Sequence, residues 1–369
     1  MRGLVLLLGT VLIVWVLWDT FETILLPRRA PGRLRFSQFV LRWLWLPWSR
    51  VSELFVGRSR REGFLAYYAL LSLVLLLIVW ATNLVLGFAM VHWGVGSKLA
   101  GAGDLTGFAR DLYMSGTTFF TLGLGDLHPV SSAARMITVI EAGTGFGFLA
   151  VVIAYVPVVY QAFSKREARI AVLDHWAGSP PSAAVILRRS FEGGDPSVLL
   201  PLLKDWETAS SEILESHMSY PILCYFRSQH DNQSWLASLS AILDTCSLVI
   251  AGVDRLDSFQ ARLTFAIGRH ALVDICQTLS LRPEEIPPMD PAERRELRRW
   301  LAEASVRLSD DADADRKLDE LRVLYRPYAE TLSRLLRMPL PSMLPPPGTR
   351  CNGETAWART APNDAHRAS

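Results

Sequence analysis

The sequence predicts an all-α membrane protein with a helical domain outside the membrane, and three observations lead to this fold class. Half of the 369 residues are hydrophobic and twelve are tryptophan, a composition more apolar than that of ordinary soluble domains. Three stretches are long enough to cross a bilayer, which takes roughly 20 apolar residues. Residues 164–338 instead repeat their apolar side chains at helical spacing. The net charge of +2 gives no indication of a nucleic-acid partner.

The first predicted element is a transmembrane helix within residues 1–26. Its apolar run extends from Leu4 to Leu26, with Asp19 and Glu22 in the last third. We expect these carboxylates to form an ion pair with Arg28 or Arg29 at the membrane surface. A cleaved signal peptide is the alternative, but no small-residue cleavage site follows the apolar run.

Residues 27–62 are predicted to form a cytoplasmic segment rich in arginine and tryptophan. Nine arginines stand here against two acidic residues, and such an excess of positive charge is typical of the cytoplasmic side. The stretch "FVLRWLWLPWSRVSELF" interleaves tryptophans with arginines. This pattern fits a helix lying on the inner leaflet, or equally a helix packed against the other helices.

Two further transmembrane helices are predicted within residues 63–163, at Phe64–Val91 and Met136–Phe163. The segment between them carries only Lys98 and Arg110 against three aspartates, so it should be external. The N-terminus would then lie outside, and the chain after Ser164 in the cytosol. We therefore expect a multi-pass protein of the cytoplasmic (inner) membrane. Small residues in the last span allow close helix contacts or bending, and these are Gly143, Gly145 and Gly147.

The external segment contains the most unusual backbone of the chain. Residues 107–120, "GFARDLYMSGTTFF", are compatible with a short helix, and "TLGLGD" follows directly at residues 121–126. Gly123 and Gly125 can take positive φ without steric cost, which lets successive carbonyls point the same way. A row of carbonyls facing one axis is a site for a dehydrated cation. Asp126 would stand at its outer mouth.

This part of the chain resembles the potassium-channel pore module, which consists of an outer helix, a pore helix, a filter of the T-V-G-Y-G-D type and an inner helix. The residues that carry the resemblance are Thr121, Leu122, Gly123, Leu124, Gly125, Asp126, Pro129 and Arg135. The likeness covers residues 64–163, and the whole layout looks like bacterial proteins described as two-pore-type potassium channels. It implies K⁺ as the permeant ion and no cofactor. Because each chain has one filter, it also implies a homotetramer.

Two departures from the family pattern concern how the filter is held in place. Leu124 replaces the usual aromatic residue, so the hydroxyl that ties family filters to the pore helix is missing, and Leu122 replaces a valine. The residues expected to support the filter instead are Tyr113, Thr117, Thr118 and Glu141. Glu141 is expected to accept hydrogen bonds from the pore helix rather than to line the ion path. Asp126 must find another partner or stay solvated, and Gly145 stands where the family often has a hinge glycine.

Residues 164–338 are predicted to form a cytosolic bundle of five or six helices. Trp235–Val253 approaches spanning length, but Asp244 at its middle favours a helix in the core of that bundle. The acidic stretch at residues 310–320 is interpreted as a helix start, because Arg322 stands where a calcium loop needs a glutamate. The scattered histidines and cysteines indicate no metal site beyond K⁺ at the filter. Residues 339–369, rich in proline and then polar, are predicted to be disordered.

Together these features predict a tetrameric potassium-selective channel that is gated through its cytosolic helical domain. A non-selective cation channel is one alternative, and a membrane-anchored sensor or scaffold with a vestigial pore is another. An enzyme is not expected, because no nucleophile, base and orienting group are recognisable together. The expected partners are the lipid bilayer, other copies of the chain, and an unidentified cytosolic ligand or protein.

Overall fold

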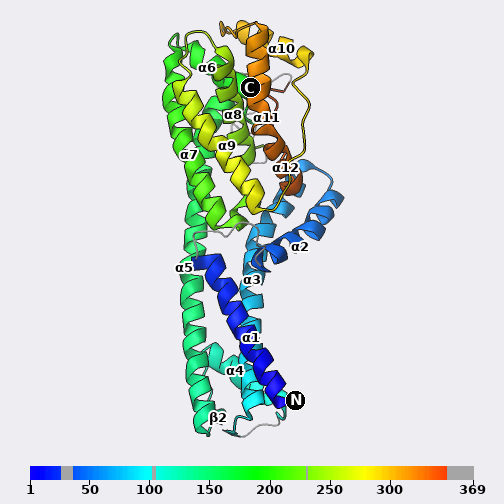
Figure 1. Ribbon diagram of the computed structural model, residues 1–369, viewed down its shortest axis with the longest axis vertical. Coiled ribbons are helices and arrows are strands. Elements are labelled where there is room, and N and C mark those ends of the chain that lie inside the picture. The colour runs from blue at the N-terminus through cyan, green and yellow to red at the C-terminus, as the bar shows by residue number, and fades with distance from the viewer. Residues whose placement is uncertain (26–35, 102–104, 230–231, 347–369) are drawn as a thin grey trace, which may run out of the picture. The chain divides into compact units, whose positions relative to one another are not determined.

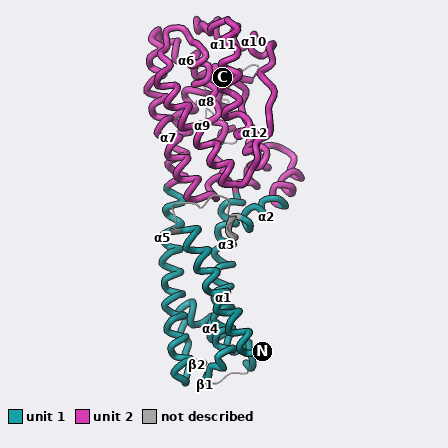
Figure 2. The backbone as a smooth tube through the Cα atoms, viewed as in Figure 1, with its two compact units in different colours: residues 1–47, 67–161 teal, residues 48–66, 162–369 magenta. Residues whose placement is uncertain are grey.

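The computed structural model describes residues 1–25, 36–101, 105–229 and 232–346, and these are almost entirely helical, as predicted (Figure 1). The chain divides into two compact units (Figure 2). The first contains residues 1–47 and 67–161, and the second contains residues 48–66 and 162–369. Within the described residues, four helices are long and apolar enough to cross a membrane: Arg2–Ile24, Arg58–Val95, Ser132–Ala177 and Trp235–Gly252.

In the first unit, helix α1 (Arg2–Thr20) continues into a π-helical turn, η1 (Phe21–Leu25), and packs on helix α3 (Arg58–Val95). Glycines bring the two backbones close together. A Cβ atom added at Gly9 would lie 2.7 Å from the carbonyl oxygen of Gly87, and one added at Gly94 would lie 2.6 Å from the Cβ of Leu6. Contacts between small residues of this kind are typical of helices packed within a membrane.

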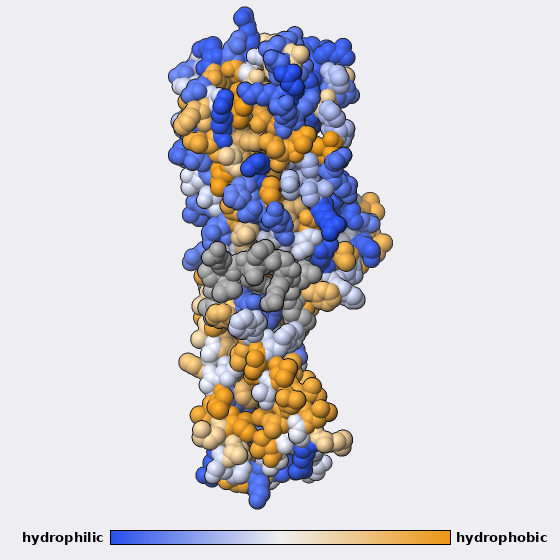
Figure 3. All heavy atoms as spheres, in the orientation of Figure 1, coloured by the Kyte–Doolittle hydropathy of each residue, from blue (hydrophilic) through white to orange (hydrophobic). Residues whose placement is uncertain are grey.

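Large apolar side chains cover much of the surface of the first unit (Figure 3). Helix α1 alone exposes several of them, among them Leu7, Val11, Val14 and Trp18. An apolar surface this extensive is unusual for a protein surrounded by water. It is the surface expected of helices in contact with lipid.

Asp19 lies near the end of α1 and is buried, with 4% of its surface exposed. Its carboxylate Oδ2 accepts a hydrogen bond of 2.8 Å from the Nε1–H group of Trp80 on α3. The predicted partners Arg28 and Arg29 lie outside the described residues, so that ion pair stays a prediction. The structure adds a buried partner that the sequence did not indicate.

Helix α2 (Phe36–Val51) combines features of the two arrangements that the sequence left open. On one face Leu41 and Trp45 are buried, with the Trp45 ring edge-on to Tyr68 of α3 at 4.7 Å between centroids. The Tyr68 hydroxyl also donates to the carbonyl of Leu41. Phe39 and Trp43 remain exposed. The helix is therefore packed against α3 and still presents aromatic side chains at its surface.

The remaining elements of the first unit are helix α4 (Phe108–Phe119), strands β1 (Leu99–Gly101) and β2 (Leu127–Pro129), and helix α5 (Ser132–Ala177). The two strands pair antiparallel, with Leu99 opposite Pro129. Helix α5 does not end at Phe163 as expected, but continues to Ala177. Pro157 removes one backbone donor without ending the helix. Burial of Ile170 and Leu173 stabilises the added turns.

The second unit contains seven α-helices in its described part after α5, more than the five or six predicted. They are α6 (Ala183–Glu192), α7 (Leu199–Ser219), α8 (Trp235–Gly252), α9 (Phe259–Thr278), α10 (Pro291–Ala302), α11 (Ala312–Val323) and α12 (Arg326–Leu336). Helices α11 and α12 follow each other closely, with only Leu324 and Tyr325 between them. The chain breaks between these two because Pro327, in the first turn of α12, has no N–H with which to continue the preceding helix.

Helix α8 is the centre of the second unit, and every residue from Trp235 to Ile250 is buried. Asp244, which is 1% exposed, accepts a hydrogen bond from the Tyr325 hydroxyl. Its other oxygen lies 3.7 Å from the guanidinium of Arg326. The prediction of a core helix is confirmed, even though α8 has the length and composition of a membrane span.

The acidic stretch at residues 310–320 begins a helix, as predicted. Asp311 precedes the first turn of α11, and its carboxylate accepts a 2.6 Å hydrogen bond from the amide of Ala314. Among the described residues there is no group of three or more side chains that could hold a metal ion. Cys224, Cys246 and Cys276 are buried, and within the described residues they form no disulfide bond.

The segment at residues 339–346 is ordered, which corrects part of the predicted disorder at residues 339–369. Met343 is 3% exposed, and its carbonyl accepts hydrogen bonds from the Ser182 hydroxyl at 2.7 Å and the Ala184 amide at 3.0 Å. The proline content suggested disorder, but burial of the apolar Met343 side chain holds residues 339–346 in place. Residues 347–369 lie outside the described part of the chain.

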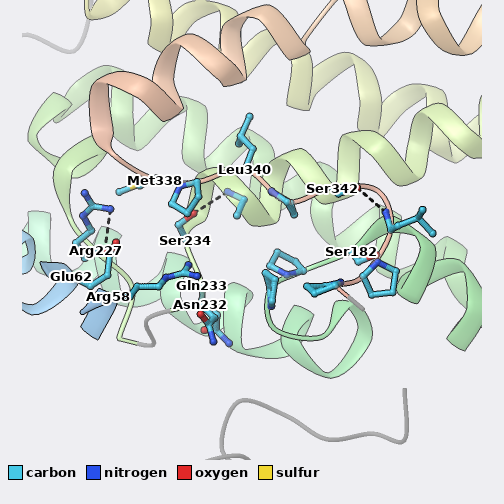
Figure 4. A pocket seen from close by; sticks show the side chains of 18 of the residues that line it. Arg58, Glu62, Ser182, Arg227, Asn232, Gln233, Ser234, Met338, Leu340 and Ser342 are labelled. Atoms are coloured by element: carbon cyan, nitrogen blue, oxygen red, sulfur yellow. Dashed lines mark hydrogen bonds and ion pairs between the residues drawn. The ribbon is translucent and has the colours of Figure 1, made fainter. Parts of the chain in front are cut away.

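The ordered segment lines a cavity of about 450 Å³ in the second unit (Figure 4). On one wall the Arg227 guanidinium lies 3.2 Å from the Glu62 carboxylate and also donates to the carbonyls of Leu336 and Arg337. Burial lowers the pKa of Arg227 to about 10, against the opposing effect of Glu62. Arg227 therefore keeps its charge at neutral pH.

Candidate ion-conducting site

The six residues from Thr121 to Asp126 leave the end of helix α4 with an alternating backbone. Thr121, Gly123 and Gly125 have φ values of 56°, 58° and 78°, whereas Leu122 and Leu124 between them do not have positive φ. The positive φ predicted for the two glycines is confirmed. Positive φ at Thr121 was not predicted, because a residue other than glycine seldom takes it.

Hydrogen bonds at the end of α4 explain the conformation of Thr121. The amide of Leu122 donates to the carbonyl of Thr117 at 2.8 Å, and the amide of Thr121 donates to the carbonyl of Thr118 at 3.0 Å. These are the two bonds of a Schellman motif, in which the residue after the helix cap is left-handed. Sequence reasoning missed the positive φ at Thr121, because glycine usually stands at this position of the motif.

Thr117 and Thr118, two of the expected support residues, thus accept hydrogen bonds from residues 121–123 through their backbone carbonyls. The Thr117 hydroxyl donates to the carbonyl of Met114 within α4, at 3.0 Å. The support comes from the geometry of the helix end, and it does not depend on the threonine side chains reaching the filter.

Asp126 has the partner that the sequence left open. Its Oδ2 accepts a 2.7 Å hydrogen bond from the hydroxyl of Tyr113 on α4, and its Oδ1 accepts one of 3.0 Å from the amide of Leu127. This hydroxyl lies on α4, whereas the family pattern has its hydroxyl at the position of Leu124. The hydrogen bond is made at the last residue of the candidate filter, residues 121–126.

The two-stranded sheet anchors the chain just beyond Asp126, and sequence reasoning missed it because each strand has only three residues. Gly101, with a φ of 141°, lies against the carbonyl oxygen of Asp126 so closely that a Cβ atom there would collide with it. Arg110 of α4 donates to the carbonyl of Leu99 at 2.8 Å. Arg135 donates to the carbonyl of Pro129 at 3.3 Å, which explains the spacing of these two motif residues.

Glu141 of α5 is fully buried behind helix α4. It accepts a hydrogen bond from the Ser115 hydroxyl on α4, and it lies 3.4 Å from Nε2 of His92 on α3. Nδ1 of His92 in turn lies 2.8 Å from the Ser97 hydroxyl. The contact with the pore helix is the one expected for Glu141. His92 and Ser115 were not identified from sequence, because an isolated histidine or serine in an apolar helix carries no recognisable pattern.

The three glycines proposed as a hinge have different surroundings. A Cβ atom at Gly145 would collide with the carbonyl oxygen of Phe119, so this glycine permits close contact between α5 and the end of α4. Cβ atoms at Gly143 and Gly147 would meet nothing within 4 Å. Helix α5 continues through all three, and their role in a bending motion stays a prediction.

Comparison with known proteins agrees with the geometry of this site. Residues 73–162, which include most of α3, residues 121–126 and about two thirds of α5, match a family model described as an ion channel. This part of the chain is an ion-channel pore domain of the potassium-channel-like type, and the protein is a membrane protein.

A second match extends over a longer part of the chain. The chain is 20% identical over 258 residues to the uncharacterized membrane protein YdjJ of Bacillus subtilis (strain 168), and the match covers 68% of this chain and 72% of that relative. No solved structure matches the chain.

Proposed function

We propose that the protein is a homotetrameric potassium-selective channel of the cytoplasmic membrane. The observation that carries the proposal is the strict alternation of positive φ at Thr121, Gly123 and Gly125 with Leu122 and Leu124. Alternating handedness turns successive carbonyls toward one side of the strand. Four such strands around an axis would form the rings of oxygen atoms that replace the water around K⁺.

The exposed apolar residues at the filter support assembly into a tetramer. Phe120, Leu122 and Leu124 have 59%, 61% and 61% of their surface exposed in the single chain. Large apolar side chains gathered in this way mark an interaction surface, and three neighbouring chains would cover them. The C-terminal end of α4, with its partial negative charge, leads directly into the filter and favours a cation there.

The tie between Tyr113 and Asp126 supports selectivity for K⁺ over Na⁺, since it restrains the filter where the family hydroxyl is missing. A non-selective cation channel is the second candidate, because Leu124 leaves the middle of the filter without a hydroxyl tie. Gating is assigned to the second unit, since helix α5 contains residues of both units. No catalytic role is proposed.

The test is single-channel recording from purified protein in planar bilayers, with K⁺ on one side and Na⁺ on the other. A reversal potential set by K⁺ is the expected result. Equal permeability to both ions would establish the non-selective channel instead. Absence of current from protein that is tetrameric by light scattering would favour the vestigial pore.

A further inference from the structure

A second cavity, of about 810 Å³, lies within the second unit where the start of α3 meets the end of α12. Four arginines line it, two from the first turn of α3 and two from the end of α12: Arg58, Arg61, Arg334 and Arg337. The one acidic residue of the lining is Glu62. Such an excess of guanidinium groups is complementary to a phosphate.

The neighbouring carboxylates leave two of these arginines available. Arg337 pairs with Glu53 at 2.7 Å, and Arg334 pairs with Glu284. Glu62 is held by Arg227 (Figure 4). No carboxylate in the described part of the chain lies within ion-pair distance of Arg58 or Arg61. Arg61 is moreover only partly exposed.

The backbone at the cavity adds to the attraction for an anion. Gly57, with a φ of 100°, precedes the first residue of α3, and it lines the cavity together with Arg58. The first amide groups of a helix have no partner within the helix and carry a partial positive charge. Backbone and side chains therefore favour negative charge at the same place.

The surroundings of the cavity indicate where the anion comes from. Leu54 and Val56, on either side of the cavity-lining residue Phe55, have 80% and 88% of their surface exposed. The apolar run of α3 begins at Phe64, whose ring stacks on Trp48 with 4.4 Å between centroids. Exposed apolar residues and tryptophan beside basic residues are typical of the boundary between lipid and water.

From this arrangement we propose that the cavity binds the phosphate group of an anionic phospholipid. The guanidinium groups of Arg58 and Arg61 contact the phosphate, and Leu54 and Val56 lie against the adjoining part of the lipid. The site lies outside the ion-channel domain. Its occupation does not require that the pore conduct, so the two proposals stand or fall separately.

The test measures binding of short-chain dioctanoyl-phosphatidylglycerol to the purified full-length protein in neutral detergent. The variant is Arg58→Gln with Arg61→Gln. Two arginines close to a phosphate together contribute on the order of 10-fold or more in affinity, so we expect at least that loss. The control is Arg60→Gln, which removes one positive charge from the same helix turn at an exposed position outside the cavity lining, and it is compared with Arg61→Gln as well as with the double variant. It should bind like the parent.

Further measurements distinguish binding of an anionic phospholipid from the alternative explanations. Dioctanoyl-phosphatidylcholine should bind much more weakly, and inorganic phosphate should not compete at equal concentration. An equal loss with Arg60→Gln would overturn the proposal in favour of diffuse charge attraction. Competition by inorganic phosphate would assign the cavity to a soluble phosphate compound instead. If the double variant loses its fold by circular dichroism, Arg61→Gln alone is measured, and unchanged binding then contradicts the proposal.

Discussion

At the scale of single residues, the candidate filter depends on backbone positions more than on side chains. Gly123 and Gly125 have positive φ, and a Cβ atom at either would meet nothing within 4 Å. Within the single chain, space is therefore not what selects glycine here. The requirement is conformational, and Thr121 meets the same requirement only because the end of α4 holds it in a Schellman motif.

We expect Gly123→Ala to abolish K⁺ flux. A left-handed conformation costs alanine roughly 1–2 kcal/mol. The backbone at position 123 would therefore leave this conformation, and a carbonyl of the candidate filter would no longer face the proposed pore axis. Flux into K⁺-loaded liposomes measures the effect, and size-exclusion chromatography reports on assembly. Gly3→Ala is the control, since this glycine lies within α1 and also has open space around it. Parental flux through Gly123→Ala would show that these carbonyls do not form the ion site.

The hydrogen bond between Tyr113 and Asp126 should matter for selectivity. Tyr113→Phe removes the hydrogen bond that joins α4 to the Asp126 carboxylate in each chain. The outer end of the filter should then be looser, and permeability to Na⁺ relative to K⁺ should rise. Bi-ionic reversal potentials measure the ratio. Tyr67→Phe, at an exposed position on α3, is the control. If both variants are as selective as the parent, the filter is held by the β1–β2 anchor and the helix end alone.

At the scale of elements, helices α3, α4 and α5 are joined by buried polar side chains near the candidate filter. His92 of α3, Ser115 of α4 and Glu141 of α5 lie together and are all fully buried. Buried polar groups are costly unless they are paired. This cluster therefore specifies one arrangement of the three helices, whereas the apolar contacts around it would tolerate small shifts.

Glu141→Ala should lower the thermal stability of the assembled protein. Leaving buried partners unsatisfied costs about 1–3 kcal/mol for each group. The double variant Glu141→Ala with His92→Ala should lose less than the sum of the two single variants, because the groups are in contact. Thermal unfolding followed by tryptophan fluorescence measures each variant. Thr144→Ala, at an exposed position on α5, should change little. Strict additivity would contradict the coupling.

In the second unit, a buried polar contact likewise joins α8 to Tyr325, the residue just before α12. Tyr325→Phe removes the hydroxyl that donates to buried Asp244 and should destabilise this unit by about 1–3 kcal/mol. Hydrogen exchange of the α8 and α12 amides in the full-length protein should become faster. Tyr328→Phe, one turn further along α12, is the control. Unchanged exchange in both variants would mean that Arg326 alone satisfies Asp244.

At the scale of the whole molecule, charge placement is the basis for the proposed orientation in the membrane. Cysteines introduced by Lys98→Cys and Ser59→Cys, each in a protein without native cysteines, test it in intact cells. Position 98 should react with an impermeant thiol reagent, because the proposed orientation places it outside the cell. Position 59 should react only after the cells are opened. The reverse pattern would mean that residues 27–62 lie outside the cytosol.

Local features of the sequence predicted much of the fold of this protein. Apolar runs of spanning length predicted α1, α3 and α5, and the glycines of the filter predicted where φ is positive. Asp244 at the middle of an apolar stretch predicted that α8 belongs to a protein core. Each of these conclusions depends on residues close together in the chain. Helical periodicity, backbone sterics and desolvation of a charge act on the same short stretches.

Only the tertiary structure decided which distant residues are partners. Three contacts near the candidate filter join segments that are far apart in the chain. They are the hydrogen bond between Tyr113 and Asp126, the pairing of strands β1 and β2, and the contact of Glu141 with His92. The order at Met343 likewise depends on Ser182, far away in the chain. These contacts carry no periodic signal, because a single polar residue forms the same local structure with or without its partner. Its burial and its hydrogen bond exist only once the helices have packed.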